Sequence, residues 1–260
     1  MDRMLRPLSR FAPVAAGLCA AAFWCGGAVA GAWTQEPGVG FASQTFRYFE
    51  TTTGAPFQRA SFTAYVEYGL LDRLTIGGEL DQGARLDEAA QGAQNGRAAA
   101  FVRGRLWKDD EGNVASVQIG GSTPLSGFVS PAAPGGDDAD EVEGRLMVGR
   151  GFAGDWGSGW AEAAFGLSHF TGSRADEASV DLTAGFRPDE DWVALAQVFA
   201  TYGLRNEAFG GTDFDAVKLQ VSVGRKLFGE RTFLLSVARD VHTRGTSAGF
   251  EVSLSIWSSF

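Results

Sequence analysis

The sequence predicts an all-β fold, a closed antiparallel transmembrane β-barrel of about twelve strands that follows a cleaved signal peptide. Three observations predict it: a charge-free apolar N-terminal segment, apolar and polar residues that alternate with period two, and an even number of such alternating segments. After the N-terminal segment, no stretch of about 18 uncharged apolar residues occurs, so we expect any membrane crossing to be made by strands.

Residues 1–30 have the pattern of a secretory signal peptide. Three Arg residues precede an apolar stretch from Phe11 to about Val29 that carries no charge. Small residues follow at cleavage-site spacing, as Ala28-Val29-Ala30 and again as Ala30-Gly31-Ala32, so we expect cleavage after residue 30 or after residue 32. An anchor helix is the alternative, but the prolines and glycines of this segment disfavour a long helix. The remaining chain, 31–260, is expected to be one β-barrel domain.

The composition of the expected mature chain excludes several kinds of site. Cys19 and Cys25 both lie in the signal segment, which leaves no disulfide, thiol nucleophile or thiolate metal ligand. Without the signal, the counts fall from 22 basic and 31 acidic residues to 19 and 30, a net charge of −11, which disfavours nucleic acid as a partner. The acidic segment 137–141 lacks the spaced Gly of an EF-hand loop, so we expect a solvated loop there. Neither a metal nor a cofactor is expected.

Alternation with period two is the main sign of strands. In residues 62–70 the even positions are apolar or aromatic, while the odd positions include Thr63 and Glu67. Segments 74–80, 180–187 and 217–223 alternate in the same way. A water-soluble β-sandwich alternates too, so this pattern alone does not identify a membrane barrel.

The number of strands is the next observation. Turn signals between the alternating segments give twelve strands, an even number as in bacterial single-chain barrels. The expected strands are 39–49, 59–70, 74–85, 97–107, 114–122, 141–150, 159–170, 178–187, 192–204, 215–226, 232–241 and 249–260.

The connections between these strands differ in length at the two expected ends, as in barrels with short periplasmic turns and longer outer loops. The expected periplasmic connections are 71–73, 108–113, 151–158, 188–191 and 228–231. The expected outer connections include 88–96, 123–140, 205–214 and 242–248. The segment 151–158 is an exception to the short turns, and 51–58 is of middling length.

The last expected strand ends on an aromatic residue. Apolar side chains alternate through Val252, Leu254 and Ile256, and the chain stops at Phe260. This strand resembles the C-terminal signal of Gram-negative outer-membrane proteins, in which a terminal Phe after alternating apolar positions is recognised by the barrel-assembly machinery. The resemblance implies an outer-membrane location, with outer-membrane lipid, lipopolysaccharide and that machinery as partners. The alternative is a hydrophobic edge strand, which would promote aggregation in a soluble protein.

A second resemblance covers about ten residues. The segment Tyr68–Gly77 is similar to a strand-turn-strand phrase of small proteobacterial barrels, including channels of phenol degradation. A tight Asp-Arg turn between two alternating strands would produce it in any barrel.

The polar face of the strands is expected to line the lumen, because apolar side chains must face lipid. The expected lumen residues are Glu67, Glu79, Asp81, Arg103, Arg105, Glu143, Arg145, Glu162, Asp181, Arg187, Lys218, Lys226 and Glu251. Arg103 and Arg105 share the face that also holds Arg97. We interpret these charges as a mixed-sign constriction of a narrow channel or transporter for small polar solutes. A structural barrel whose lumen is plugged by paired charges is the alternative, because the width of about twelve strands allows both.

An embedded lipid hydrolase is a further alternative. The segment Ser168-His169-Phe170-Thr171-Gly172 is similar to the His-x-Ser-Asn motif of such enzymes, but Thr171 stands in place of the nucleophilic Ser and Gly172 in place of Asn. Because the departure falls on the nucleophile, we do not expect an enzyme.

Overall fold

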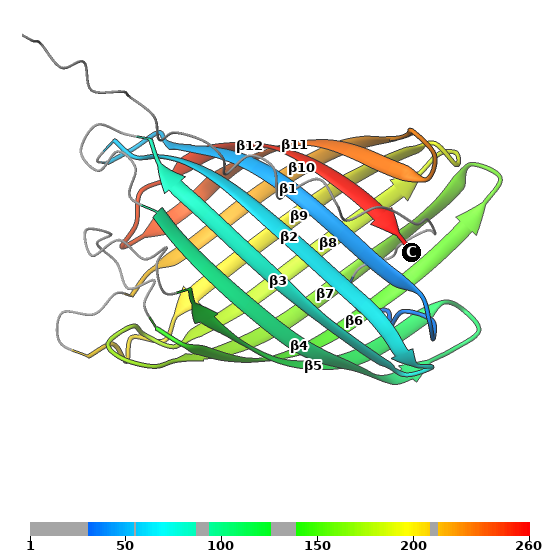
Figure 1. The fold of residues 1–260 in the computed structure, drawn as a ribbon, viewed down its shortest axis with the longest axis horizontal. Helices are drawn as coiled ribbons and strands as arrows, with labels where there is room; N and C mark the ends of the chain where they lie inside the picture. Colours follow the sequence, from blue (N-terminus) through cyan, green and yellow to red (C-terminus); the bar gives the residue numbers. More distant parts are fainter. Residues whose placement is uncertain (1–30, 55, 87–93, 126–138, 209–212) are drawn as a thin grey trace, which may run out of the picture.

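The computed structural model describes residues 31–260, except residue 55 and the segments 87–93, 126–138 and 209–212. The predicted signal peptide and Asp137 and Asp138 of the acidic segment lie outside the described residues. The described part of the chain forms twelve strands (Figure 1). These are β1 (Gly40–Thr51), β2 (Gln58–Leu71), β3 (Leu74–Arg85), β4 (Gln94–Lys108), β5 (Asn113–Pro124), β6 (Glu141–Gly154), β7 (Gly157–Phe170), β8 (Glu177–Arg187), β9 (Trp192–Gly203), β10 (Asp215–Leu227), β11 (Arg231–Arg244) and β12 (Gly249–Ser259). None of the described residues forms a helix long and apolar enough to cross a membrane.

The strands close into a barrel. Each pairs antiparallel with its neighbours in the chain, and β1 pairs with β12 from Phe41 opposite Ser259 to Thr51 opposite Gly249. The sheet therefore has no free edge, and the predicted closed antiparallel barrel of about twelve strands is confirmed.

The two ends of the barrel differ in their connections. At the end where β1 begins and β12 stops, the connections are the short segments 72–73, 109–112, 155–156, 188–191 and 228–230. The expected long connection 151–158 is wrong: β6 and β7 continue to a two-residue turn at Asp155 and Trp156. Gly157 makes this turn possible, because its φ of 119° suits a residue without a β-carbon. Every connection at this end is short, and we call it the short-turn end.

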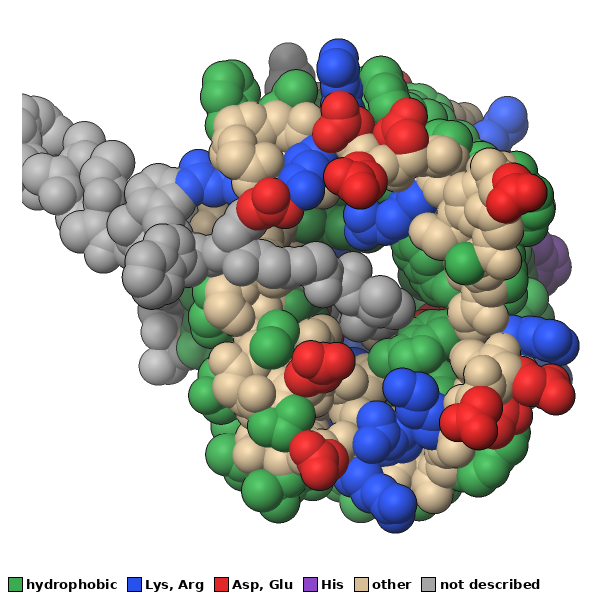
Figure 2. Space-filling view, turned by 90° about the vertical axis from the view of Figure 1, so that its right-hand side faces the viewer, with side chains coloured by type: hydrophobic (Ala, Val, Ile, Leu, Met, Phe, Trp, Pro, Cys, Tyr) green, Lys and Arg blue, Asp and Glu red, His purple; other side chains and the backbone are tan. Residues whose placement is uncertain are grey.

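The inner and outer faces of the wall differ in chemistry. Large apolar side chains such as Ile119, Val142 and Leu235 are exposed on the outside, at 64%, 61% and 58%. On β12 the other face holds Glu251, Ser253 and Ser255, which are buried. An apolar exterior around a polar interior requires lipid outside, so the barrel spans a membrane. Figure 2 shows the short-turn end, with hydrophobic side chains on the outer surface, charged side chains around the rim and a hollow at the centre.

The segment that precedes β1 lies inside the barrel. Residues 31–39 precede β1 and contact inward-facing side chains of several strands. Pro37 and Gly69 form an isolated parallel bridge, and the Gly38 amide donates to the Gly69 carbonyl at 2.9 Å. We call residues 31–39 the inner segment.

Candidate functional site: the barrel lumen

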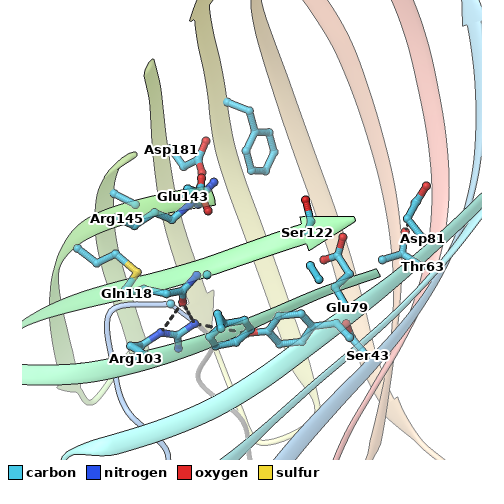
Figure 3. Close-up of a pocket in the computed structure, with 18 of the residues that line it drawn as sticks. Ser43, Thr63, Glu79, Asp81, Arg103, Gln118, Ser122, Glu143, Arg145 and Asp181 are labelled. Atoms are coloured by element: carbon cyan, nitrogen blue, oxygen red, sulfur yellow. Dashed lines mark hydrogen bonds and ion pairs between the residues drawn. The ribbon is translucent and has the colours of Figure 1, made fainter. Parts of the chain in front are cut away.

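The lumen holds a cavity of about 620 Å³ (Figure 3). Because successive side chains of a strand point to opposite faces, every second side chain points toward the lumen. Its charged lining residues are Arg47, Glu79, Asp81, Arg97, Arg103, Glu141, Glu143, Arg145, Glu162 and Asp181. Among the described residues, six carboxylates and four guanidinium groups therefore share a confined space.

Arg145 lies between two carboxylates on one wall of the cavity. Its Nε is 2.7 Å from Glu143 Oε1, and its Nη1 is 2.8 Å from Asp181 Oδ2. In Figure 3 these three side chains group together, away from Glu79 and Asp81. The cluster carries one negative charge in excess.

A second group of charges connects β1, β2, β3, β10 and β12. Asp81 lies 2.8 Å from Arg59 Nη2 and 3.8 Å from Arg47 Nη1. Arg47 also approaches Glu251, at 3.7 Å, and Lys218 Nζ lies 3.0 Å from the same carboxylate. Arg47 on β1 thus connects an acidic residue of β3 with an acidic residue of β12. Such a chain of paired charges links the strands of the wall and places both signs of charge inside the barrel.

A buried ion pair lies closer to the short-turn end. Arg103 Nη1 is 3.0 Å from Glu67 Oε2, with side-chain exposures of 4% and 0%. The Tyr65 hydroxyl donates to the same oxygen at 2.7 Å, and Arg103 donates twice to Gln118 Oε1, at 3.1 and 3.0 Å. Gln35 Nε2 of the inner segment donates to the other oxygen of Glu67. Three donors of the described residues therefore compensate the Glu67 carboxylate, which is removed from water.

The inner segment is bound mainly through its backbone. The Ala32 amide donates to Glu162 Oε2 at 2.9 Å, and the Ser116 hydroxyl donates to the Ala32 carbonyl. The Trp33 carbonyl accepts from Arg103 Nη1 at 3.2 Å, and the Gln35 amide donates to Thr75 Oγ1 at 2.8 Å. Thr75 and Ser116 are fully buried beneath it. The segment therefore narrows the lumen at this level.

Apolar contacts add to this narrowing. Ala32 packs with Val114, Met147 and Ala164, and Trp33 covers this cluster. A second inward-facing cluster consists of Val193, Leu195 and Leu234, with Trp160 and Trp257 against it. The lumen is thus polar in the cavity and partly apolar toward the short-turn end.

The expected lumen residues fall into three groups. Seven line the cavity: Glu79, Asp81, Arg103, Glu143, Arg145, Glu162 and Asp181. Glu67 and Glu251 do not line it but pair with the lining residues Arg103 and Arg47, and Lys218 pairs with Glu251. Arg105, Arg187 and Lys226 lie near strand ends: Arg105 is in a smaller pocket with Arg73 and Lys108, Arg187 lies 5.9 Å from the Trp160 ring, and Lys226 pairs with Glu230. The structure thus separates Arg103 from Arg105.

Pattern reasoning missed several residues of the lumen. Three of them could have been predicted from the sequence, because each lies in an expected strand at an alternating position: Arg47, Arg59 and Glu141. Trp33 and Gln35 could not have been predicted, because they belong to no alternating segment, and their contacts are with residues 32 or more positions away.

His169 lies at the opposite end from the short turns. Its side chain is 73% exposed, and its Nδ1 is 2.8 Å from Asp176 Oδ1. Thr171 Oγ1 accepts a hydrogen bond from the Asp140 amide at 2.9 Å. The two residues of the lipase-like segment are therefore engaged with acidic loop residues rather than with each other.

Comparisons with known proteins agree with this architecture. No family model matches the sequence, and no curated protein matches it. Among solved structures, the COG4313 outer membrane channel from Pseudomonas putida is similar with a TM-score of 0.63 and 11% identity, over 87% of this chain and 97% of that one. The KdgM porin in complex with disordered oligogalacturonate has a TM-score of 0.55 at 6% identity, over 84% and 99% of the two chains. The NanC porin has 0.55 at 7%, over 83% and 98%. The chain has the fold of bacterial outer-membrane β-barrels.

Proposed function

We propose that the barrel is a narrow outer-membrane channel or transporter for small polar solutes. The observation that carries the proposal is the mixed-charge cavity inside a closed, lipid-facing barrel. Charged side chains that line a narrow pore replace part of a solute's hydration and select by sign. Two of the similar solved structures are porins, one of them in complex with an oligogalacturonate, and this supports conduction of small polar molecules.

The main alternative is a structural barrel with a plugged lumen. The inner segment favours it, because this segment buries Thr75, Ser116 and the Arg103–Glu67 pair. The lipid hydrolase has less support, since His169 and Thr171 are engaged with acidic residues of the loops. We also propose outer-membrane lipid, lipopolysaccharide and the barrel-assembly machinery as partners of this protein, as the resemblance of its last strand implies.

Displacement of the inner segment distinguishes a channel from a plugged barrel. Gly149 faces the lumen, and a β-carbon there would overlap the Trp33 ring. The Gly149→Val variant should therefore displace the inner segment and increase the conductance of refolded protein in planar bilayers. Gly144→Val is the matched control, because Gly144 lies on the same strand with open space around it.

The conductance of the wild-type protein, compared with that of the two variants, tests the proposal. A small, reproducible unitary conductance that Gly149→Val enlarges and Gly144→Val leaves unchanged supports a channel. If the wild type does not conduct and Gly149→Val does, the plugged barrel is the better description. If neither conducts, the channel is excluded.

A further inference from the structure

Glu162 is a lumen carboxylate with an incomplete set of partners. Among the residues that the structure describes, its hydrogen bond is to the Ala32 amide, and no ion pair joins it to an Arg or Lys side chain. The other carboxylates at this level are better compensated: Glu67 has Arg103, and Glu143 and Asp181 share Arg145. A positive charge beside a carboxylate stabilises its ionised form, which is otherwise unfavourable in a partly desolvated lumen.

Gly31 lies against this carboxylate. A β-carbon at Gly31 would overlap the Glu162 side chain, and the φ of Gly31, 108°, suits glycine. The Gly31 nitrogen is separated from the Ala32 amide, which donates to Glu162 at 2.9 Å, by a single residue. One residue of backbone spans at most about 3.6 Å, so a charge on the Gly31 nitrogen would lie close to Glu162.

We propose that cleavage between Ala30 and Gly31 creates an α-ammonium group that pairs with Glu162 and anchors the inner segment in the lumen. A peptidase hydrolyses the Ala30–Gly31 bond with one water molecule, which leaves a carboxylate on Ala30 and an amine on Gly31. The amine takes up a proton at neutral pH. Glu162 gains a charge partner that the uncleaved chain, with a neutral amide at this position, does not provide.

The geometry also selects one of the two expected cleavage positions. Cleavage after Ala32 would remove a fully buried side chain from the cluster with Val114 and Met147. It would also remove the amide that donates to Glu162 and the carbonyl that accepts from Ser116. Cleavage after Ala30 keeps all of these contacts.

The test uses protein extracted from outer membranes in mild detergent. Its N-terminus is determined by intact mass and sequencing, and an N-terminus at Gly31 is expected, whereas Trp33 would overturn the proposal. The folded protein is then treated with an amine acylating reagent, and modification of the N-terminal peptide is followed by mass spectrometry.

We expect the N-terminal amine to react at least about tenfold more slowly in the folded protein than in urea, because a nearby carboxylate favours the protonated, unreactive amine. Glu162→Gln should remove most of this protection. Glu79→Gln is the matched control, because Glu79 is also a cavity carboxylate without an ion pair to a described side chain, but lies on β3. Glu162→Asp keeps the charge and should retain part of the protection, which separates charge pairing from loss of folding.

An amine that reacts equally fast in folded protein and in urea would overturn the proposal, as would equal protection in Glu162→Gln and wild type. Because acylation is measured without any solute or current, these results do not depend on the proposed function. A barrel that never conducts could still have its N-terminus paired with Glu162.

Discussion

At the residue scale, the lumen combines charges that alternation along the strands places inside with partners that only the fold determines. The Arg103–Glu67 pair illustrates both. Alternation predicts that each side chain faces inward, but their pairing joins β2 to β4 across β3, and it needs the inner segment as a cover. The sequence therefore predicts which charged side chains face the lumen. It does not predict their partners, which depend on the strand register and on segments outside any strand.

Substitution of Arg103 tests how strongly this buried pair holds the barrel together. Arg103→Met leaves Glu67 buried without its cation, so the free energy of unfolding should fall by about 3–5 kcal/mol. Chemical unfolding of the refolded protein in detergent, followed by Trp fluorescence, measures it. Arg105→Met is the control and should change stability by no more than about 0.5 kcal/mol, since Arg105 is partly exposed near the short turns. A double variant that also carries Glu67→Gln should recover part of the loss, and equal losses in the two single Arg variants would contradict a structural pair.

At the element scale, most strands could be predicted from the sequence, but some boundaries and one segment could not. Period-two alternation identifies β2, β3, β8 and β10 because each strand contacts lipid on one face and the lumen on the other. The sequence predicts the end of β6 at residue 150, which is too early, because the two-residue turn at Asp155 and Trp156 has no Asn-Gly signal. The inner segment has no periodicity at all. Its position depends on a cavity that exists only after the barrel has closed.

The junction of β1 and β12 gives a prediction about assembly. The backbones of Gly40 and Phe260 exchange two hydrogen bonds, at 2.7 and 2.9 Å, and a β-carbon at Gly40 would overlap the Phe260 ring. If Phe260 is also the recognition signal, Phe260→Ser should lower the amount of inserted protein severalfold while export across the inner membrane continues. Membrane fractionation measures both.

A control variant separates the terminal position from the loss of an exposed aromatic ring. Phe228→Ser removes a side chain that is 82% exposed in a short turn, and it should insert at wild-type levels. Wild-type insertion of Phe260→Ser would show that the terminal Phe carries no assembly signal.

At the scale of the whole molecule, closure predicts resistance to detergent. All twelve strands of the described chain pair on both sides, so unfolding has no edge from which to begin. Unboiled protein should keep its structure in dodecyl sulfate and migrate differently from boiled protein on a gel. Identical migration of the two samples, together with recovery in the periplasmic fraction, would contradict a membrane-inserted barrel.

The charge balance of the cavity gives the last prediction, which concerns ion selectivity. Arg145 neutralises part of the field of Glu143 and Asp181, at 2.7 and 2.8 Å, in a confined space where screening by salt is weak. Arg145→Gln leaves both carboxylates facing the pore. The cation-to-anion permeability ratio should then rise by at least about twofold, which corresponds to only about 0.4 kcal/mol. Reversal potentials under a salt gradient measure this ratio.

Arg225→Gln is the matched control, because Arg225 is exposed and lies 5.2 Å from the Trp192 ring rather than in the cavity. An equal shift in both variants would mean that overall charge, and not the cavity, sets the preference. A conducting Arg145→Gln variant with unchanged selectivity would place the path of ions away from this cluster.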